Sequence, residues 1–187
     1  RWVFVGLIPL VAMLYVAILT RINDYGVTEN RYAVLAMAVG LSVVVVYFLV
    51  SRRKDIRIVP IVLCLLAFLS AYGPWSALSV STSSQQSRLE ALLEEYDALA
   101  DGTIQEITAD VSYDDRREMS SIIRYLSEWH GPEAFEPWLT DSTLDSLRSL
   151  HTYEQTIYVA ELMGIQLASP RTAPDGGEYF RLQADVP

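Results

Sequence analysis

The sequence is poor in the residues that carry most enzyme chemistry. Its 187 residues include one cysteine, Cys64, and two histidines, His130 and His151. A single cysteine excludes an intrachain disulfide, and neither histidine has a second metal ligand at helical spacing. A Walker loop, a Gly-x-Ser-x-Gly elbow and a dinucleotide fingerprint are also missing. We therefore assign no catalytic, metal-binding or cofactor-binding residue from the sequence, and no cofactor.

Charge is missing from three long stretches in the first eighty residues. The runs Val3–Thr20, Tyr32–Val50 and Ile58–Val80 have 18, 19 and 23 residues without Asp, Glu, Lys or Arg. A helix needs about 20 mostly apolar residues to cross a bilayer, and a soluble helix is rarely apolar on every face. The sequence predicts a transmembrane region over residues 1–80, with spans at about 3–20, 32–50 and 58–80. Because Pro74 follows Gly73, we expect a kink or a new helix start near residues 72–75.

The two halves of the chain carry opposite net charge. Up to Val80, seven basic residues face three acidic ones, a net charge of +4, whereas seven basic residues face twenty acids from Ser81 onward, a net charge of −13. Four of the basic residues lie in the short connection 51–57, and basic loops stay in the cytoplasm. We expect this loop to be cytoplasmic and residues 81–187 to lie on the extracytoplasmic side of the membrane. An acidic domain is repelled by phosphates, which excludes nucleic acid as a partner.

The spans lack the features of an ion pathway. Ion-coupled transporters usually keep ionisable residues inside the membrane, and these runs have none. In the second run Ala33, Ala36 and Gly40 form a strip of small residues where another helix could pack closely, a spacing that is also common by chance.

The acidic half reads as a small domain of helices with a few strands. A stripe in Gln85–Leu99 predicts an amphipathic neck helix within residues 81–100, followed by a domain over 101–187. We expect a strand at 103–107, a helix capped by Ser112 and ended by Gly131-Pro132, and helices at 142–150 and 153–163 before Gly164. Alternation in residues 179–183 suggests another strand. The fold class is therefore an α-helical integral membrane region followed by a mainly α or α+β extramembrane domain.

A few residues of this domain have alternative interpretations. His130 at a helix end is more typical of an exposed or capping group than of a base. Asp114, Asp115 and Glu118 favour a solvated first turn over a cation site. Five aromatic residues are most simply core, with a peptide or glycan groove as the alternative: Trp129, Phe135, Trp138, Tyr153 and Tyr158.

The external connection and two later motifs resemble a known family. In residues 21–32 we expect Asn23, Asp24 and Gly26 to form a turn, Thr28 to cap the next helix, and Tyr25, Tyr32 and the arginines to anchor at headgroups, with a ligand-facing loop as the alternative. The segments 25–32 (YGVTENRY), 51–55 (SRRKD) and 73–81 (GPWSALSVS) are similar to the bacterial family called domain of unknown function 4153. The resemblance is good over residues 20–100 and looser at 117–131. It implies multi-span inner-membrane proteins with further spans before Arg1, and brings no catalytic residues.

These observations leave two classes of function open. The first is a non-enzymatic membrane protein whose external acidic domain docks a partner or senses a signal. Its partners are then the lipid bilayer, the other spans of the full-length protein and an envelope protein. The alternative is a fragment of an envelope enzyme or transporter whose active residues lie outside this chain. Without a starting Met or a cleavage pattern, we expect the chain to begin inside a longer protein, and to be truncated after residue 187.

Overall fold

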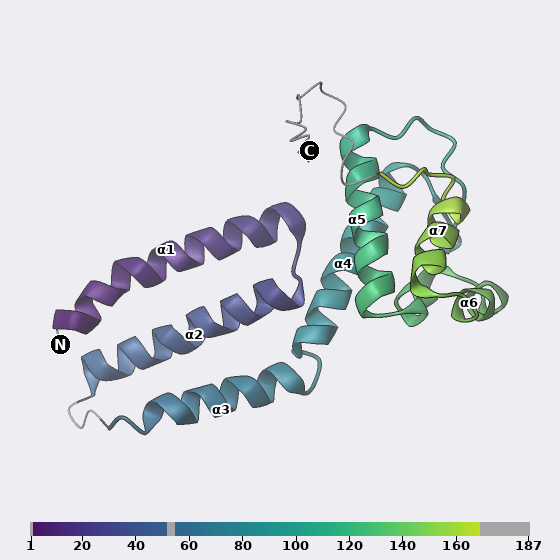
Figure 1. Ribbon diagram of the computed structural model, residues 1–187. Coiled ribbons are helices and arrows are strands. Elements are labelled where there is room, and N and C mark those ends of the chain that lie inside the picture. The colour runs from purple at the N-terminus through teal and green to yellow at the C-terminus, as the bar shows by residue number, and fades with distance from the viewer. Residues whose placement is uncertain (1, 52–54, 169–187) are drawn as a thin grey trace, which may run out of the picture.

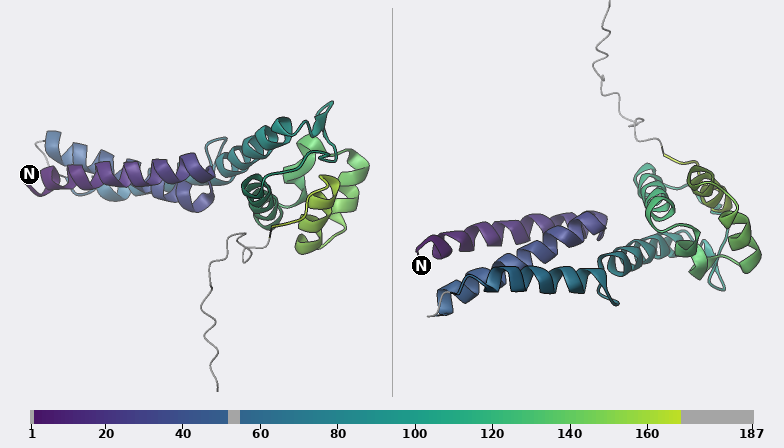
Figure 2. Two further views of the ribbon diagram at one scale, coloured as in Figure 1. Left: turned by 90° about the horizontal axis from the view of Figure 1, so that it is seen from above. Right: turned by 60° about the horizontal axis from the view of Figure 1, so that its bottom comes forward.

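The computed structural model describes residues 2–51 and 55–168, and it divides them into a long helical arm and a compact group of helices at one end of that arm (Figure 1). The arm consists of α1 (Trp2–Tyr25), α2 (Glu29–Val50) and α3 (Ile58–Ala71). These helices lie side by side, and the views in Figure 2 agree on this arrangement. The far end of the arm holds the start of α1, the end of α2 and the start of α3.

Two helices of the arm are long and apolar enough to cross a membrane. They are α1 over Val3–Tyr25 and α2, and only 6% and 17% of their most apolar windows are buried within the described structure. The apolar side chains therefore face outward, which indicates association with a membrane. Among the exposed side chains are Val3 and Met13, at 74% and 69%.

The third predicted span is interrupted. α3 ends at Ala71 after 14 residues, and a new helix, α4 (Ala77–Glu95), begins after Gly73 and Pro74. The backbone of Gly73 has a φ of +89°, and Ser76 caps α4 by accepting a hydrogen bond from the Ser79 N–H. The expected break near residues 72–75 is confirmed, because proline and a left-handed glycine end the helix there, and the predicted span over 58–80 is therefore made of two helices.

Contacts within the arm use small and polar side chains. Gly40 of α2 is buried, and a Cβ there would overlap Leu66 of α3, so this residue of the predicted small strip allows a close helix approach, whereas Ala33 is exposed. Between α1 and α2, Tyr15 Oη lies 3.1 Å from Ser42 Oγ. The predicted strip is thus used only in part.

The compact group is built on α4 and the helices that follow it. A hairpin of β1 (Leu99–Ala100) and β2 (Thr103–Ile104) leads to α5 (Tyr113–Trp129), the 3-10 helix η1 (Pro132–Trp138), α6 (Asp141–Arg148) and α7 (Thr152–Leu162). Ser112 caps α5 by accepting from the Asp115 N–H at 3.1 Å, as expected. The neck helix ends at Glu95, earlier than expected, because Asp97 takes a left-handed conformation before the hairpin. The predicted strand at 179–183 lies outside the described residues.

One apolar core holds this group together. Leu89 and Leu93 of α4 pack with α5, η1, α6 and α7, whose fully buried members include Met119, Phe135 and Val159. Phe135, Trp138 and Tyr158 join or touch this core, as expected. Trp129 and Tyr153 do not, because they are 65% and 75% exposed, so their assignment to the core is wrong. Both residues lie at helix ends, where a side chain can extend beyond the apolar core into solvent.

Candidate functional site at the hairpin loop

The loop between α1 and α2, residues 26–28, is called the hairpin loop here and is distinct from the β1–β2 hairpin. It is held by side chains of α4. Gln85 Nε2 donates to the carbonyls of Tyr25 (3.2 Å) and Val27 (3.0 Å), and the Val27 N–H donates to Ser84 Oγ at 2.9 Å. Gly26 is buried beneath them with a φ of +71°, and a Cβ there would lie 2.7 Å from Gln85 Nε2. Because Ser84 and Gln85 bind the Val27 N–H and the carbonyls of Tyr25 and Val27, α4 fixes the conformation of the loop.

An arginine extends this contact to α5. Arg88 of α4 donates to the carbonyls of Asn23 (3.2 Å) and Asp24 (2.9 Å) at the end of α1. The same guanidinium forms an ion pair with Glu118 of α5. Arg88 therefore links α1, α4 and α5. Its planar guanidinium presents several N–H donors in fixed directions, which a lysine ammonium does not.

Glu29, the first residue of α2, is the centre of a second contact with the compact group. Its carboxylate accepts hydrogen bonds from Ser81 Oγ of α4 at 2.9 Å and from Tyr125 Oη of α5 at 2.5 Å, and His130 Nε2 lies 3.1 Å from it. We call Glu29, Ser81, Tyr125 and His130 the Glu29 cluster. Hydrogen bonds to an ionised carboxylate are among the stronger ones in proteins, so the cluster joins the arm to the compact group.

His130 is buried in this cluster, with a side chain only 8% exposed. Its Nδ1 lies 2.9 Å from Thr82 Oγ1, whose hydroxyl donates to the Leu78 carbonyl. The ring therefore lies between the Thr82 hydroxyl of α4 and the Glu29 carboxylate of α2. His130 is the C-cap residue of α5, so the prediction of a capping histidine is confirmed, whereas exposure of its side chain is not, because the end of α5 is pressed against α4.

Tyr125 donates to Glu29 from a half-buried position on α5. Burial raises the pKa of its phenol well above the ordinary value, and the hydrogen bond to the Glu29 carboxylate raises that pKa further. Tyr125 therefore stays protonated and donates to Glu29 across the physiological pH range.

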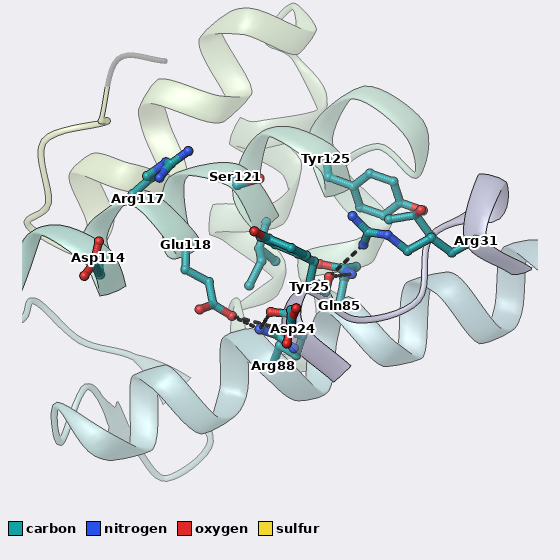
Figure 3. A pocket seen from close by; sticks show the side chains of 12 residues that line it. Asp24, Tyr25, Arg31, Gln85, Arg88, Asp114, Arg117, Glu118, Ser121 and Tyr125 are labelled. Atoms are coloured by element: carbon teal, nitrogen blue, oxygen red, sulfur yellow. Dashed lines mark hydrogen bonds and ion pairs between the residues drawn. The ribbon is translucent and has the colours of Figure 1, made fainter. Parts of the chain in front are cut away.

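A cavity opens beside these contacts, between the hairpin loop, α4 and α5. It has a volume of about 330 Å³ and is lined by residues from the end of α1, the start of α2 and both later helices. Figure 3 shows Arg31 and Tyr125 on one side of it, Asp114, Arg117 and Glu118 on the other, and Tyr25 between them. Its size suits a small molecule or a headgroup.

The acidic residues singled out in the sequence have separate roles. Asp115 accepts hydrogen bonds from Ser112 Oγ and Tyr96 Oη, both at 2.6 Å, and these bonds lower the pKa of its carboxyl. Glu118 pairs with Arg88, whereas Asp114 lines the cavity. The three carboxylates therefore do not converge on one point. His151 precedes α7, where its N–H donates to Glu154 at 3.0 Å.

The hairpin loop differs from its expected structure at several positions. Asn23 and Asp24 belong to α1, so the turn is confined to Gly26–Thr28, and Thr28 precedes α2 without a side-chain capping bond. Arg31 donates to the carbonyls of Tyr25 and Gly26 at 3.0 and 2.9 Å, and Tyr32 donates to the Trp75 carbonyl at 2.6 Å. Both side chains therefore bond to backbone carbonyls, Arg31 to those of the loop and Tyr32 to one in the segment before α4.

Sequence reasoning missed the Glu29 cluster. The partners of Glu29 lie 52 and 96 positions further along the chain at Ser81 and Tyr125. No periodicity or motif links positions so far apart. The only signal was the presence of Glu29 at a helix start, where a local role in the first turn explains it equally well.

Comparison with known proteins identifies one family. The family model described as "Domain of unknown function (DUF4153)" matches residues 1–103. An uncharacterised protein of Pasteurella multocida (strain Pm70) is 31% identical over 96 residues, which are 51% of this chain and 16% of that protein. The chain thus spans a small part of this relative's length, and no solved structure matches it. The resemblance at residues 117–131 lies beyond the matched region. Since the family model matches more than half of the chain, the chain belongs to the family of domain of unknown function 4153.

Proposed function

We propose that this chain is part of a bacterial inner-membrane protein whose arm, α1–α3, lies in the bilayer. The outward apolar faces of α1 and α2 support this placement, since lipid covers such faces at no cost. α3 is about 21 Å long at 1.5 Å per residue, shorter than the hydrocarbon core of about 30 Å. The segment Tyr72–Ser76 completes a third crossing in this proposal, with Tyr72 and Trp75 at the interface.

The proposed orientation follows from charge and from the geometry of the arm. The basic connection 51–57 joins α2 to α3, whose adjoining ends lie at the far end of the arm from the compact group. A basic loop stays in the cytoplasm, which places the acidic compact group outside the cell membrane.

In this proposal the external domain docks an envelope partner or senses a signal, and passes the event to the membrane helices. The observation that carries this role is the Glu29 cluster, because it attaches α4 and α5 directly to the start of a proposed membrane helix. A domain on a flexible tether could not transmit a shift of α5 to α2, whereas a domain held by charged hydrogen bonds can. The net charge of −13 favours a partner with a basic surface.

Cysteine labelling in whole cells tests the placement. In a Cys64→Ala background, Glu90→Cys puts an exposed thiol on α4 and Ile56→Cys puts one in the basic connection. An impermeant thiol reagent is expected to label position 90 in intact cells and position 56 only after the cells are opened. The opposite pattern, or recovery of the protein in the aqueous phase without detergent, would end the proposal.

A further inference from the structure

The cavity at the hairpin loop carries equal numbers of opposite charges. Arg31, Arg88 and Arg117 contribute three positive charges, and Asp24, Asp114 and Glu118 three negative ones. An anion site would have an excess of cations, and a metal site an excess of carboxylates. A lining that is neutral overall and charged locally fits a zwitterion.

Most of these charged side chains form no ion pair within the described part of the chain. Arg88 and Glu118 neutralise each other, but Arg31, Arg117, Asp24 and Asp114 form no ion pair among residues 2–51 and 55–168. Arg31 uses only Nη1, for the carbonyls of Tyr25 and Gly26, so its Nε and Nη2 have no protein acceptor there. Arg31 is half-buried and cannot be solvated as fully as a surface arginine.

The position of the cavity points to the source of the zwitterion. Its floor is the loop between α1 and α2, which lies at the membrane surface if the placement proposed above is correct, and the present inference rests on that placement. Tyr25 ends α1, and the Trp75 carbonyl accepts a hydrogen bond from Tyr32 in the first turn of α2, so both lie at this end of the arm. Such residues gather at headgroup depth. A molecule that combines a phosphate with an ammonium is abundant at that depth in bacterial membranes only as a lipid headgroup.

We propose that this cavity binds a phosphoethanolamine group, with its phosphate on Arg31 and its ammonium on Asp24. The free N–H groups of Arg31 match phosphate oxygens, and a carboxylate accepts hydrogen bonds from a primary ammonium. Choline lacks those N–H donors, and a glycerol headgroup lacks the positive charge, so the site selects ethanolamine. The phosphoethanolamine group can come from a membrane lipid or from a soluble glycerophosphodiester.

Native mass spectrometry of the delipidated protein in detergent tests this site. We expect one phosphatidylethanolamine per chain, bound about tenfold more tightly than phosphatidylcholine or phosphatidylglycerol. Asp24→Asn is expected to weaken binding about tenfold, and its side chain makes no described contact that folding needs. Asp110→Asn, an exposed change outside the cavity, serves as the matched control and should bind like the wild type.

Further measurements distinguish the two sources of the phosphoethanolamine group and show which part of the proposal is wrong if binding fails. Competition by glycerophosphoethanolamine supports a soluble or shared source, and binding of the lipid alone assigns the site to the bilayer; both results support the assigned chemistry. Equal binding of the three lipids, or unchanged binding by Asp24→Asn, would overturn it. Arg31→Gln tests the phosphate half, with folding checked by thermal denaturation. Because cysteine labelling measures membrane placement separately, loss of lipid selectivity with correct labelling rejects the cavity and leaves the placement intact.

Discussion

Glu29 shows how one carboxylate can fasten two parts of a chain. It begins α2, yet Ser81, Tyr125 and His130 all reach it from the compact group. Removing one donor leaves the partly buried Glu29 carboxylate with an unfilled hydrogen-bond position. The loss of stability therefore exceeds that from removing a surface hydrogen bond.

Replacing Tyr125 with Phe tests this contact. The change removes only the hydroxyl that donates to Glu29, and we expect a loss of about 1 to 3 kcal/mol in the free energy of unfolding. Denaturation in detergent, followed by circular dichroism, measures it. Tyr153→Phe is the matched control, because Tyr153 is 75% exposed and its hydroxyl makes no described hydrogen bond. It should change stability by less than about 0.5 kcal/mol. Equal effects of the two changes would show that the Tyr125 hydroxyl does not stabilise the fold.

Asp115 gives the start of α5 a pH dependence. Hydrogen bonds from Ser112 and Tyr96 hold the pKa of its carboxyl below the ordinary value. Because the folded pKa is lower than the unfolded one, the stabilisation is complete above the unfolded pKa and disappears as pH falls through the folded pKa. The melting temperature of the wild type should exceed that of Asp115→Asn above about pH 5, and the gap should close below about pH 4. A gap that stays constant down to pH 2 would contradict the pKa assignment.

At the scale of elements, the hairpin loop depends on one glycine for two reasons. Gly26 needs a positive φ, and α4 leaves no room for a side chain above it. Gly102 in the β-hairpin has a similar φ of +76° but open space around it. Comparing the two glycines therefore separates the free-energy cost of a left-handed backbone from the cost of steric overlap with α4.

Gly102→Ala is expected to cost about 1 kcal/mol in unfolding free energy, the penalty for a left-handed alanine. Gly26→Ala should cost at least about 1 kcal/mol more, because Gln85 and Arg88 must move and release the loop carbonyls. Chemical denaturation of both variants gives the comparison. If both lose the same free energy, α4 does not press on the loop.

The elements themselves could largely be predicted from local sequence. Apolar runs identify α1 and α2, Ser112 predicts the start of α5, and Gly73-Pro74 predicts the break before α4, since each signal acts through its own neighbours. The end of α3 at Ala71 follows from the same break, although residues 72–80 remain largely apolar. The exposure of Trp129, by contrast, could not be predicted, because its spacing along α5 matches that of the buried residues.

At the scale of the whole molecule, the candidate site lies where the arm meets the compact group. The site was not predictable, because its contacts depend on the packing of α4 against the hairpin loop. This packing brings together residues 25–31, 81–88 and 118–130. The motifs at residues 25–32, 51–55 and 73–81 indicated the family, hydropathy indicated the membrane association, and charge indicated the acidic half. The attachment of that domain to α2 is a property of tertiary structure alone.

That attachment is the central claim, and pulsed electron spin resonance measures it most directly. In a Cys64→Ala background, spin labels at Val16 on α1 and Tyr153 on α7 occupy exposed positions on the two parts. The account predicts a narrow distribution of distances between the labels, which broadens in Glu29→Ala while the helix content stays the same. A broad distribution in the chain that keeps Glu29, or no broadening in Glu29→Ala, would contradict it.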